Sequence, residues 1–279
     1  HFMFNVVNAL FFLLVMPWLV RTAKWLTPQK EKAEQDLFRH PELSDRFQDN
    51  PFAAVVNARR EVHALSQVVR GALDNALIAA SKGDLKQLSR WQRYEDHINS
   101  VHREILSYLS KIFQIEISES LSQEVGVLMR TSYNLERIGN AIANIAQHFE
   151  NVMEYDLPLS SQAWQEVNTM SETVKELMDT VGDSILEPQE DFFVKARALE
   201  KEIDEMRAQM RQNHIARIRE ERCQVDAGIA FMDILTRFEK IGDWSYNIAK
   251  GLREISPEYT DTSSSDSDSS SRLDVIDAA

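Results

Sequence analysis

Apolar residues between about positions 51 and 254 recur every three or four residues, which is the spacing of amphipathic helices. The stripe of the first such segment consists of Val55, Val62, Leu65, Val69, Leu73, Leu77 and Ile78. Asn50-Pro51 precedes it as a typical helix start, and Gly83 follows it as a typical helix end. Comparable stripes predict five further helices at about 84–112, 120–150, 160–187, 189–219 and 231–252. The pattern therefore predicts an all-α fold.

The chain begins with an apolar run of another kind, because residues 2–20 contain no charged side chain. As a helix this run would reach about 28 Å, close to a hydrocarbon core of about 30 Å. We expect a last transmembrane helix within residues 1–26, and Arg21 and Lys24 directly after the run place its C-terminal side in the cytoplasm. A secretory signal peptide would need a positive n-region and a small-residue cleavage site, which the run lacks. A buried core helix is the other interpretation, but the run is apolar on all sides.

Two amide side chains within this run point to neighbouring membrane helices. Asn5 and Asn8 are unusual in a lone lipid-facing span, and such amides normally hydrogen-bond to adjacent helices. The chain also begins without Met, so we expect further sequence upstream of His1.

Composition places the remaining boundaries. Residues 27–50 are charged and are interrupted by Pro41, as expected for a juxtamembrane connector. Residues 51–152 and 153–254 contain three predicted helices each, so we expect two antiparallel three-helix bundles. Residues 255–279 are dominated by Ser, Thr and Asp, which predicts a disordered tail.

A twelve-residue motif occurs twice, as LERIGNAIANIA from Leu135 and as FEKIGDWSYNIA from Phe238. Such self-similarity predicts an internal repeat. In each copy an acidic residue stands four positions before an Asn or Asp, so the two side chains share one helix face: these couples are Glu136/Asn140 and Glu239/Asp243. Each copy also has a glycine within the helix, at a cost of about 1 kcal/mol relative to Ala, which predicts a close approach of another backbone.

A second couple precedes each copy, Glu95/Asn99 in the first half and Glu200/Asp204 in the second. If the helices that bear them pack side by side, four carboxylates would converge in the second half: Glu200, Asp204, Glu239 and Asp243. Such an oxygen-rich cluster would suit Mg, Mn or Fe. In the first half two of the four positions are Asn, so binding at Glu95, Asn99, Glu136 and Asn140 should be weaker or lost. Two alternatives remain, a solvent-exposed acidic face and ion pairs with the basic neighbours Lys201, Lys240 and Arg137.

Composition excludes several classes of function. The formal net charge is −13 and no basic stripe occurs, so a nucleic-acid partner is not expected. The one cysteine, Cys223, cannot form an internal disulfide. No phosphate-cradling glycine loop or hydrolase motif occurs, and the histidines lack metal-ligand spacing, so we do not expect an enzyme.

The twin motif, with Asn-Ile-Ala ending each copy, resembles the signature of PhoU-like phosphate-regulatory proteins. The resemblance covers roughly residues 51–254 and implies two three-helix bundles whose ExxxD motifs can hold metal clusters. Glu200, Asp204, Glu239 and Asp243 fit that metal motif, whereas the couples Glu95/Asn99 and Glu136/Asn140 depart from it.

A membrane span followed by such a domain resembles the C-terminal part of bacterial sodium/phosphate cotransporter family proteins. This resemblance implies an upstream transport domain, sodium and phosphate as transported partners, and a PhoU-like domain that faces the cytoplasm from the inner membrane. Its function would be to regulate phosphate transport through a carboxylate-bound metal, and it is compatible with a homo-oligomer. The alternative is a membrane-tethered PhoU-like regulator that acts on a separate transporter or sensor kinase. A metal-dependent enzyme is the third and weakest hypothesis.

Overall fold

The computed structural model describes residues 16, 38–43, 49–157, 159–220 and 224–256. The chain divides into two compact units, His1–His40 and Pro41–Ala279, and the described helical bundle lies in the second. Within it the described residues form helices and no strand, which confirms the predicted all-α fold. The helices are α3 (Pro51–Lys82), α4 (Leu85–Leu88), α5 (Trp91–Phe113), α6 (Glu119–Glu154), α7 (Ser161–Ser184), α8 (Phe192–Arg219) and α9 (Val225–Glu254).

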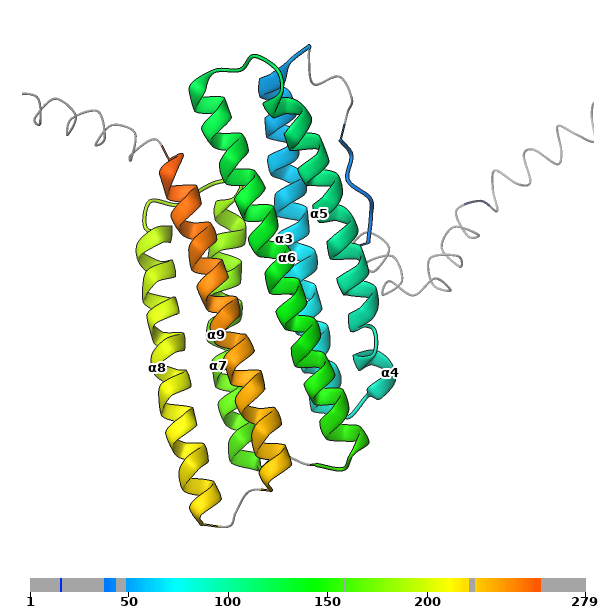
Figure 1. Ribbon diagram of the computed structural model, residues 1–279, viewed down its shortest axis with the longest axis vertical. Coiled ribbons are helices and arrows are strands. Elements are labelled where there is room, and N and C mark those ends of the chain that lie inside the picture. Colours follow the sequence, from blue (N-terminus) through cyan, green and yellow to red (C-terminus); the bar gives the residue numbers. More distant parts are fainter. Residues whose placement is uncertain (1–15, 17–37, 44–48, 158, 221–223, 257–279) are drawn as a thin grey trace, which may run out of the picture. The chain divides into compact units, whose positions relative to one another are not determined.

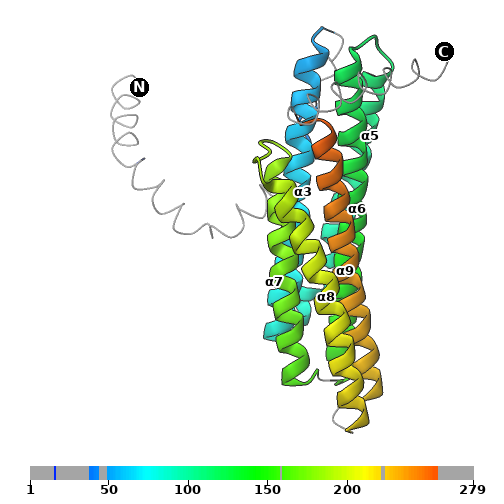
Figure 2. The same cartoon turned by 90° about the vertical axis from the view of Figure 1, so that its left-hand side faces the viewer.

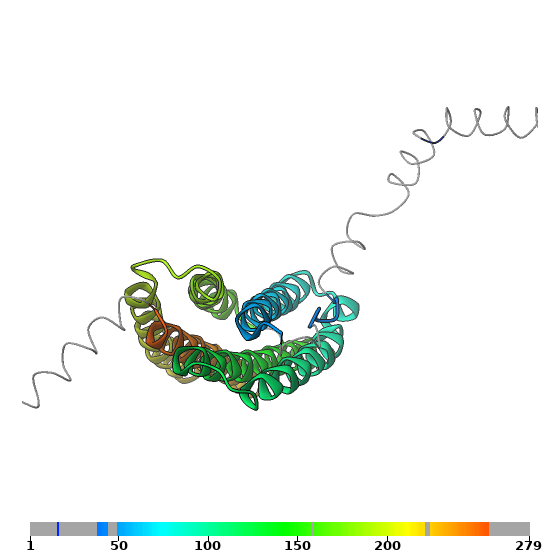
Figure 3. The same cartoon turned by 90° about the horizontal axis from the view of Figure 1, so that it is seen from above.

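The long helices form two layers that run along a common axis. Helices α5, α6, α9 and α8 lie side by side in this order, and α3 and α7 cover one face of that row (Figure 3). The first repeat consists of the three long helices α3, α5 and α6 with the single turn α4 between α3 and α5, and the second consists of α7, α8 and α9. The two repeats meet chiefly where α6 packs against α9, which runs in the opposite direction (Figure 1). They are staggered, so the α5–α6 hairpin extends at one end of the bundle and the α8–α9 hairpin at the other (Figures 1 and 2).

The ends of α3 and the start of α6 have residues that cap the helix. Asn50 accepts a hydrogen bond from the Ala53 N–H at 3.0 Å, with Pro51 as the first helical residue, as the sequence predicts. Gly83 ends α3 in the left-handed conformation, at φ 65°. Helix α6 begins slightly before its predicted start at about residue 120, because the Ser118 hydroxyl provides its N-terminal cap.

The segment predicted as one helix at about 84–112 is two helices. Helix α4 is a single turn, and α5 begins after a break at Ser89–Arg90. The side chain of Asn75 on α3 bonds twice to Gln87 on α4, once to its carbonyl at 3.3 Å and once to its amide at 3.1 Å. These tertiary bonds hold α4 against α3, and hydrophobic periodicity alone does not encode them.

The predicted apolar stripes form the core between the two layers. In α3, Val55, Val62, Leu65, Val69 and Leu73 are buried, whereas Ile78 at the end of the stripe is exposed. The largest fully buried side chains include Phe149 on α6 and Phe231 and Phe238 on α9. Phe149 stacks on Trp164 of α7 with ring centroids 5.3 Å apart, so aromatic packing also joins the two repeats.

Polar side chains of α3 bind the C-terminal end of α7. Arg59 donates to the Ile185 carbonyl at 3.2 Å, and Nδ1 of His63 lies 3.0 Å from the Gly182 carbonyl. Helix α7 has no basic residue in its last turn, so α3 supplies the positive charge that favours the negative end of the helix dipole.

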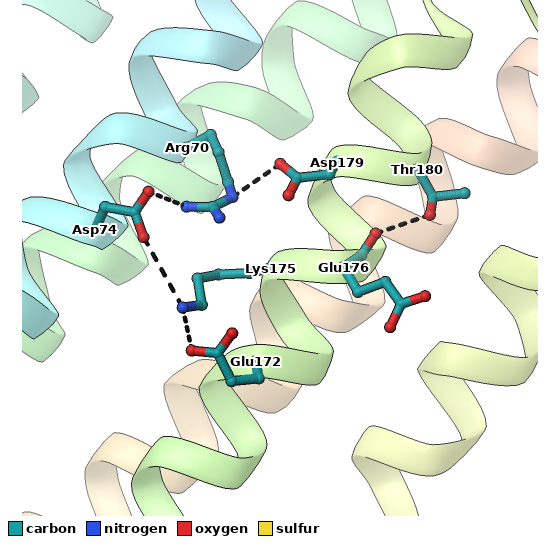
Figure 4. A network of polar contacts seen from close by, with 7 residues as sticks. All are labelled: Arg70, Asp74, Glu172, Lys175, Glu176, Asp179 and Thr180. Atoms are coloured by element: carbon teal, nitrogen blue, oxygen red, sulfur yellow. Dashed lines mark hydrogen bonds and ion pairs between the residues drawn. The ribbon is translucent and has the colours of Figure 1, made fainter.

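An ion-pair network continues this contact between the repeats (Figure 4). The guanidinium of Arg70 on α3 lies between Asp74 of its own helix and Asp179 of α7, 2.8 Å from the latter. Lys175 of α7 pairs with Glu172 and reaches Asp74 at 4.0 Å. The second repeat is thus joined to the first by alternating charges as well as by the apolar core.

No helix among the described residues is both long and apolar enough to cross a membrane. The predicted span at 1–26, with Asn5 and Asn8, lies outside the described residues except for Met16. Most of the predicted connector at 27–50 and of the predicted tail at 255–279 lies outside them as well. These assignments stay predictions.

Two glycines of α6 should respond oppositely to alanine substitution. Gly126→Ala should raise the free energy of unfolding by up to about 1 kcal/mol, because a Cβ there meets only Arg130, at 3.8 Å. Gly139→Ala should give no gain or a loss, because its Cβ would come within 3.0 Å of the Ile98 side chain. Urea denaturation measures both. Equal gains at the two positions would contradict the tight contact at Gly139.

Candidate functional site

The four helices that bear the motifs lie next to one another in one layer, with the glycines at the contacts within each repeat. Gly139 on α6 faces Ile98 on α5, and Gly242 on α9 faces Ile203 on α8, where an added Cβ would lie 3.2 Å from Cδ1 of Ile203. The glycines do mark close contacts, but the predicted approach of a backbone is wrong, because an isoleucine side chain lies at each glycine. These contacts fix the register of α5 on α6 and of α8 on α9.

In the first repeat, the motif glutamate Glu136 accepts a hydrogen bond from a residue of the same motif. Asn140 donates to Glu136 at 2.7 Å, and Asn144 donates to the Asn140 carbonyl at 2.6 Å. Burial raises the pKa of the Glu95 carboxyl, and the charges of Asp96 and Glu136 raise it further. Glu95 and Glu136 therefore lie close enough to repel each other across the α5–α6 contact. For Asn99 the described contact is through its carbonyl, which accepts from Arg103 at 3.1 Å.

In the second repeat two cations bind the motif carboxylates. Arg207 on α8 places Nε 3.2 Å from a Glu239 carboxylate oxygen on α9. Lys240 donates to Asp243 at 2.8 Å, and this hydrogen bond raises the pKa of the Lys240 ammonium. Burial raises the pKa of Glu200, as do the charges of Asp204 and Asp243.

The positions of the described side chains give little support to the predicted metal site. Across the described parts of the chain, no three Asp, Glu, His or Cys side chains are gathered closely enough to hold a metal ion. Glu239 and Asp243 already have cationic partners, so a metal would have to displace Arg207 and Lys240. The arrangement as it stands does not fit a metal, and metal binding by Glu200, Asp204, Glu239 and Asp243 stays a prediction from the sequence.

Of the basic neighbours weighed from the sequence, one pairs with a motif carboxylate. Lys240 binds Asp243, but Lys201 pairs with Glu205 at 3.4 Å. Arg137 instead lies over two aromatic rings, 4.7 Å from the ring centre of Tyr133 and 5.9 Å from that of Trp244 on α9. Arg137 thereby links the first motif to the second across the contact between α6 and α9.

Sequence reasoning missed Arg207. It follows Asp204 by three positions, so both lie on one face of α8, and this spacing was a signal. Spacing alone could not show that Arg207 turns to Glu239, because that depends on how α8 packs against α9.

The buried His102 and His214 and the half-buried His148 behave as packing groups. His102 lies 2.9 Å from the Ser132 hydroxyl, and burial lowers its pKa. Burial also lowers the pKa of His148 and of His214, which lies against the ring of Phe231. All three are therefore largely neutral near pH 7.

A groove of about 590 Å³ lies along α7 and the start of α8. Each basic residue that lines it has a carboxylate partner: Arg70 pairs with Asp179, Lys175 with Glu172, and Lys195 with Glu176. Phosphate would have to compete with these carboxylates, so the described lining residues do not make this groove a good anion site.

Glu200→Gln should raise the melting temperature at pH 7, on the order of 1 °C because the side chain is only partly buried. The pKa of Glu200 is raised, so the folded state holds this proton to higher pH than the unfolded state does. Stability is therefore lost as pH rises from the ordinary glutamate value of about 4.3 through the raised pKa. The gain in melting temperature from Glu200→Gln should therefore vanish below the ordinary glutamate pKa of about 4.3.

Calorimetry at pH 7 and at about pH 4 measures this effect, with Glu202→Gln, an exposed carboxylate of the same helix, as the charge control. A lower melting temperature for Glu200→Gln at pH 7 would show that a partner stabilises the ionised carboxylate.

Comparisons with known proteins agree with the two repeats. The PhoU domain model matches residues 62–149 and 167–252, one match in each repeat and together more than half of the chain. PhoU from Pseudomonas aeruginosa superposes with a TM-score of 0.69 at 19% sequence identity, covering 73% of this chain and 98% of that chain. The phosphate transport system regulatory protein PhoU from Streptococcus pneumoniae superposes with a TM-score of 0.64 at 17% identity, covering 73% and 95%.

The search of curated proteins found no match. At these identities the solved structures show the fold, while the family match covers the sequence of both repeats. The chain therefore belongs to the PhoU domain family, with one PhoU domain in each three-helix repeat.

Proposed function

We propose that this chain is a PhoU-type regulator of phosphate transport and acts by protein contact rather than by catalysis. The observation that carries the proposal is the tandem PhoU match on a bundle that covers nearly the whole length of two PhoU structures. One of those proteins is described as a phosphate transport system regulatory protein.

The first form of this proposal attaches the regulator to its transporter. The uncharged run at 2–20 and the resemblance to sodium/phosphate cotransporters favour a polypeptide whose last membrane helix leads into the bundle. The bundle would then lie on the cytoplasmic side of a bacterial inner membrane, next to a domain that moves sodium and phosphate.

The second form is a regulator that acts on a separate transporter or sensor kinase. It is favoured by the coverage of 98% and 95% of the two PhoU chains, since the described bundle corresponds to an almost complete PhoU protein. Both forms assign the regulatory role to the bundle, and they differ in what precedes it. Neither form has a step that runs through a metal.

Removing residues 51–254 from the natural gene should uncouple phosphate uptake from phosphate supply. Uptake of radiolabelled phosphate, compared between phosphate-rich and phosphate-starved cells, measures this coupling. In the wild type we expect a severalfold difference, and in the deletion strain we expect it to be lost. Sulfate uptake is the control. Unchanged phosphate regulation in the deletion strain would contradict the proposed function.

An antibody against the bundle separates the two forms. In membrane fractions, a native protein much larger than the 32.1 kDa of this chain supports attachment to a transport domain. A membrane-bound protein of about this size would contradict that form and favour the tethered regulator.

A further inference from the structure

The two repeats give an internal comparison of their motif sites. Ile98 and Ile203 occupy the same position, because each packs on the glycine of its repeat. Counting from them matches Asn99 with Asp204, and three residues further on it matches His102 with Arg207. The sites differ in charge, since the first has two carboxylates and two amides and the second has four carboxylates.

Each matched basic residue lies near the motif glutamate of its repeat, although the hydrogen-bond partner of His102 is the Ser132 hydroxyl, 2.9 Å away. The charge of Glu136 acts on His102, and Nε of Arg207 lies 3.2 Å from the carboxylate of Glu239. In the first repeat, three positions after the uncharged Asn99, the basic residue is His102, which burial keeps largely neutral. In the second repeat, three positions after Asp204, the basic residue is an arginine, whose guanidinium is charged at all relevant pH values.

The residue four positions after the motif glutamate also has a different role in the two repeats. Asn140 satisfies Glu136 with a neutral amide at 2.7 Å, whereas Asp243 is held by the Lys240 ammonium at 2.8 Å. Lys240 stands where the first repeat has Arg137, so a cation follows the motif glutamate in both repeats, but Arg137 lies over Tyr133 and Trp244 whereas Lys240 pairs with Asp243. In the second repeat Arg207 and Lys240 thus each pair with a motif carboxylate.

The Arg207 contact is partly sheltered from water, although the Arg207 side chain as a whole is 32% exposed. Its Nε is buried, the Glu239 side chain is 18% exposed, and the two meet as an ion pair without an aligned hydrogen bond. A metal at Glu239 would repel the guanidinium and force it out of this position. Because Arg207 belongs to the same chain as Glu239, diluting the protein does not weaken its competition with a metal for that carboxylate.

We propose that Arg207 and Lys240 are built-in counter-ions of Glu239 and Asp243 and suppress the binding of divalent metal to the second-repeat carboxylates. Arg207 neutralises Glu239 from α8, and Lys240 neutralises Asp243 from within α9. The proposal concerns this site alone and does not depend on which transporter the domain regulates.

Isothermal titration of Mn²⁺ into the protein tests the proposal directly. The double variant Arg207→Gln/Lys240→Gln should bind Mn²⁺ at least about tenfold more tightly than the wild type, because Glu239 and Asp243 would then lack their counter-ions. Adding Glu239→Gln to the double variant should remove that gain. Lys240→Gln alone, at a residue whose side chain is 44% exposed, should fold normally and give part of the gain.

Lys195→Gln is the matched control, because it also removes one positive charge from α8 but breaks the pair with Glu176 instead. It should leave Mn²⁺ affinity unchanged. The proposal is overturned if Lys240→Gln and the double variant bind Mn²⁺ no more tightly than the wild type. It is also overturned if Lys195→Gln gives the same gain, since net charge alone would then explain the effect.

Discussion

The antiparallel contact of α6 with α9 is the interaction on which the rest of the structure depends. It joins two three-helix repeats into one bundle, so α5, α6, α9 and α8 form a continuous row that α3 and α7 cover (Figure 3). Gly139 and Gly242 let the outer helices of the row pack closely, because each leaves room for an isoleucine. Since both motifs lie on this row, its packing decides which motif side chains meet.

The second constraint is electrostatic. A chain of net charge −13 must keep acidic side chains apart or supply them with partners, and this bundle does so locally. Arg70 lies between carboxylates of α3 and α7, and Arg207 neutralises Glu239 of the neighbouring helix. In the first repeat an amide, Asn140, donates a hydrogen bond to Glu136 without cancelling its charge. The two repeats therefore satisfy their motif glutamates with different chemistry.

The fold could largely be predicted from the sequence, because helical periodicity, the Asn50-Pro51 start and the glycine positions are local signals. The break before Trp91 could not, since it depends on bonds from α3 to α4. For the site, the sequence identified the acidic residues and Lys240 but not the role of Arg207. Which partner a long side chain reaches is decided by the packing of helices, and four carboxylates read alone suggest a metal more strongly than their surroundings support.

Crystals grown with Mn²⁺, measured for anomalous diffraction, test the central claim most directly. The account predicts Arg207 against Glu239 and Lys240 against Asp243, with no anomalous peak among Glu200, Asp204, Glu239 and Asp243. A peak coordinated by these carboxylates, with Arg207 and Lys240 turned away, would contradict it.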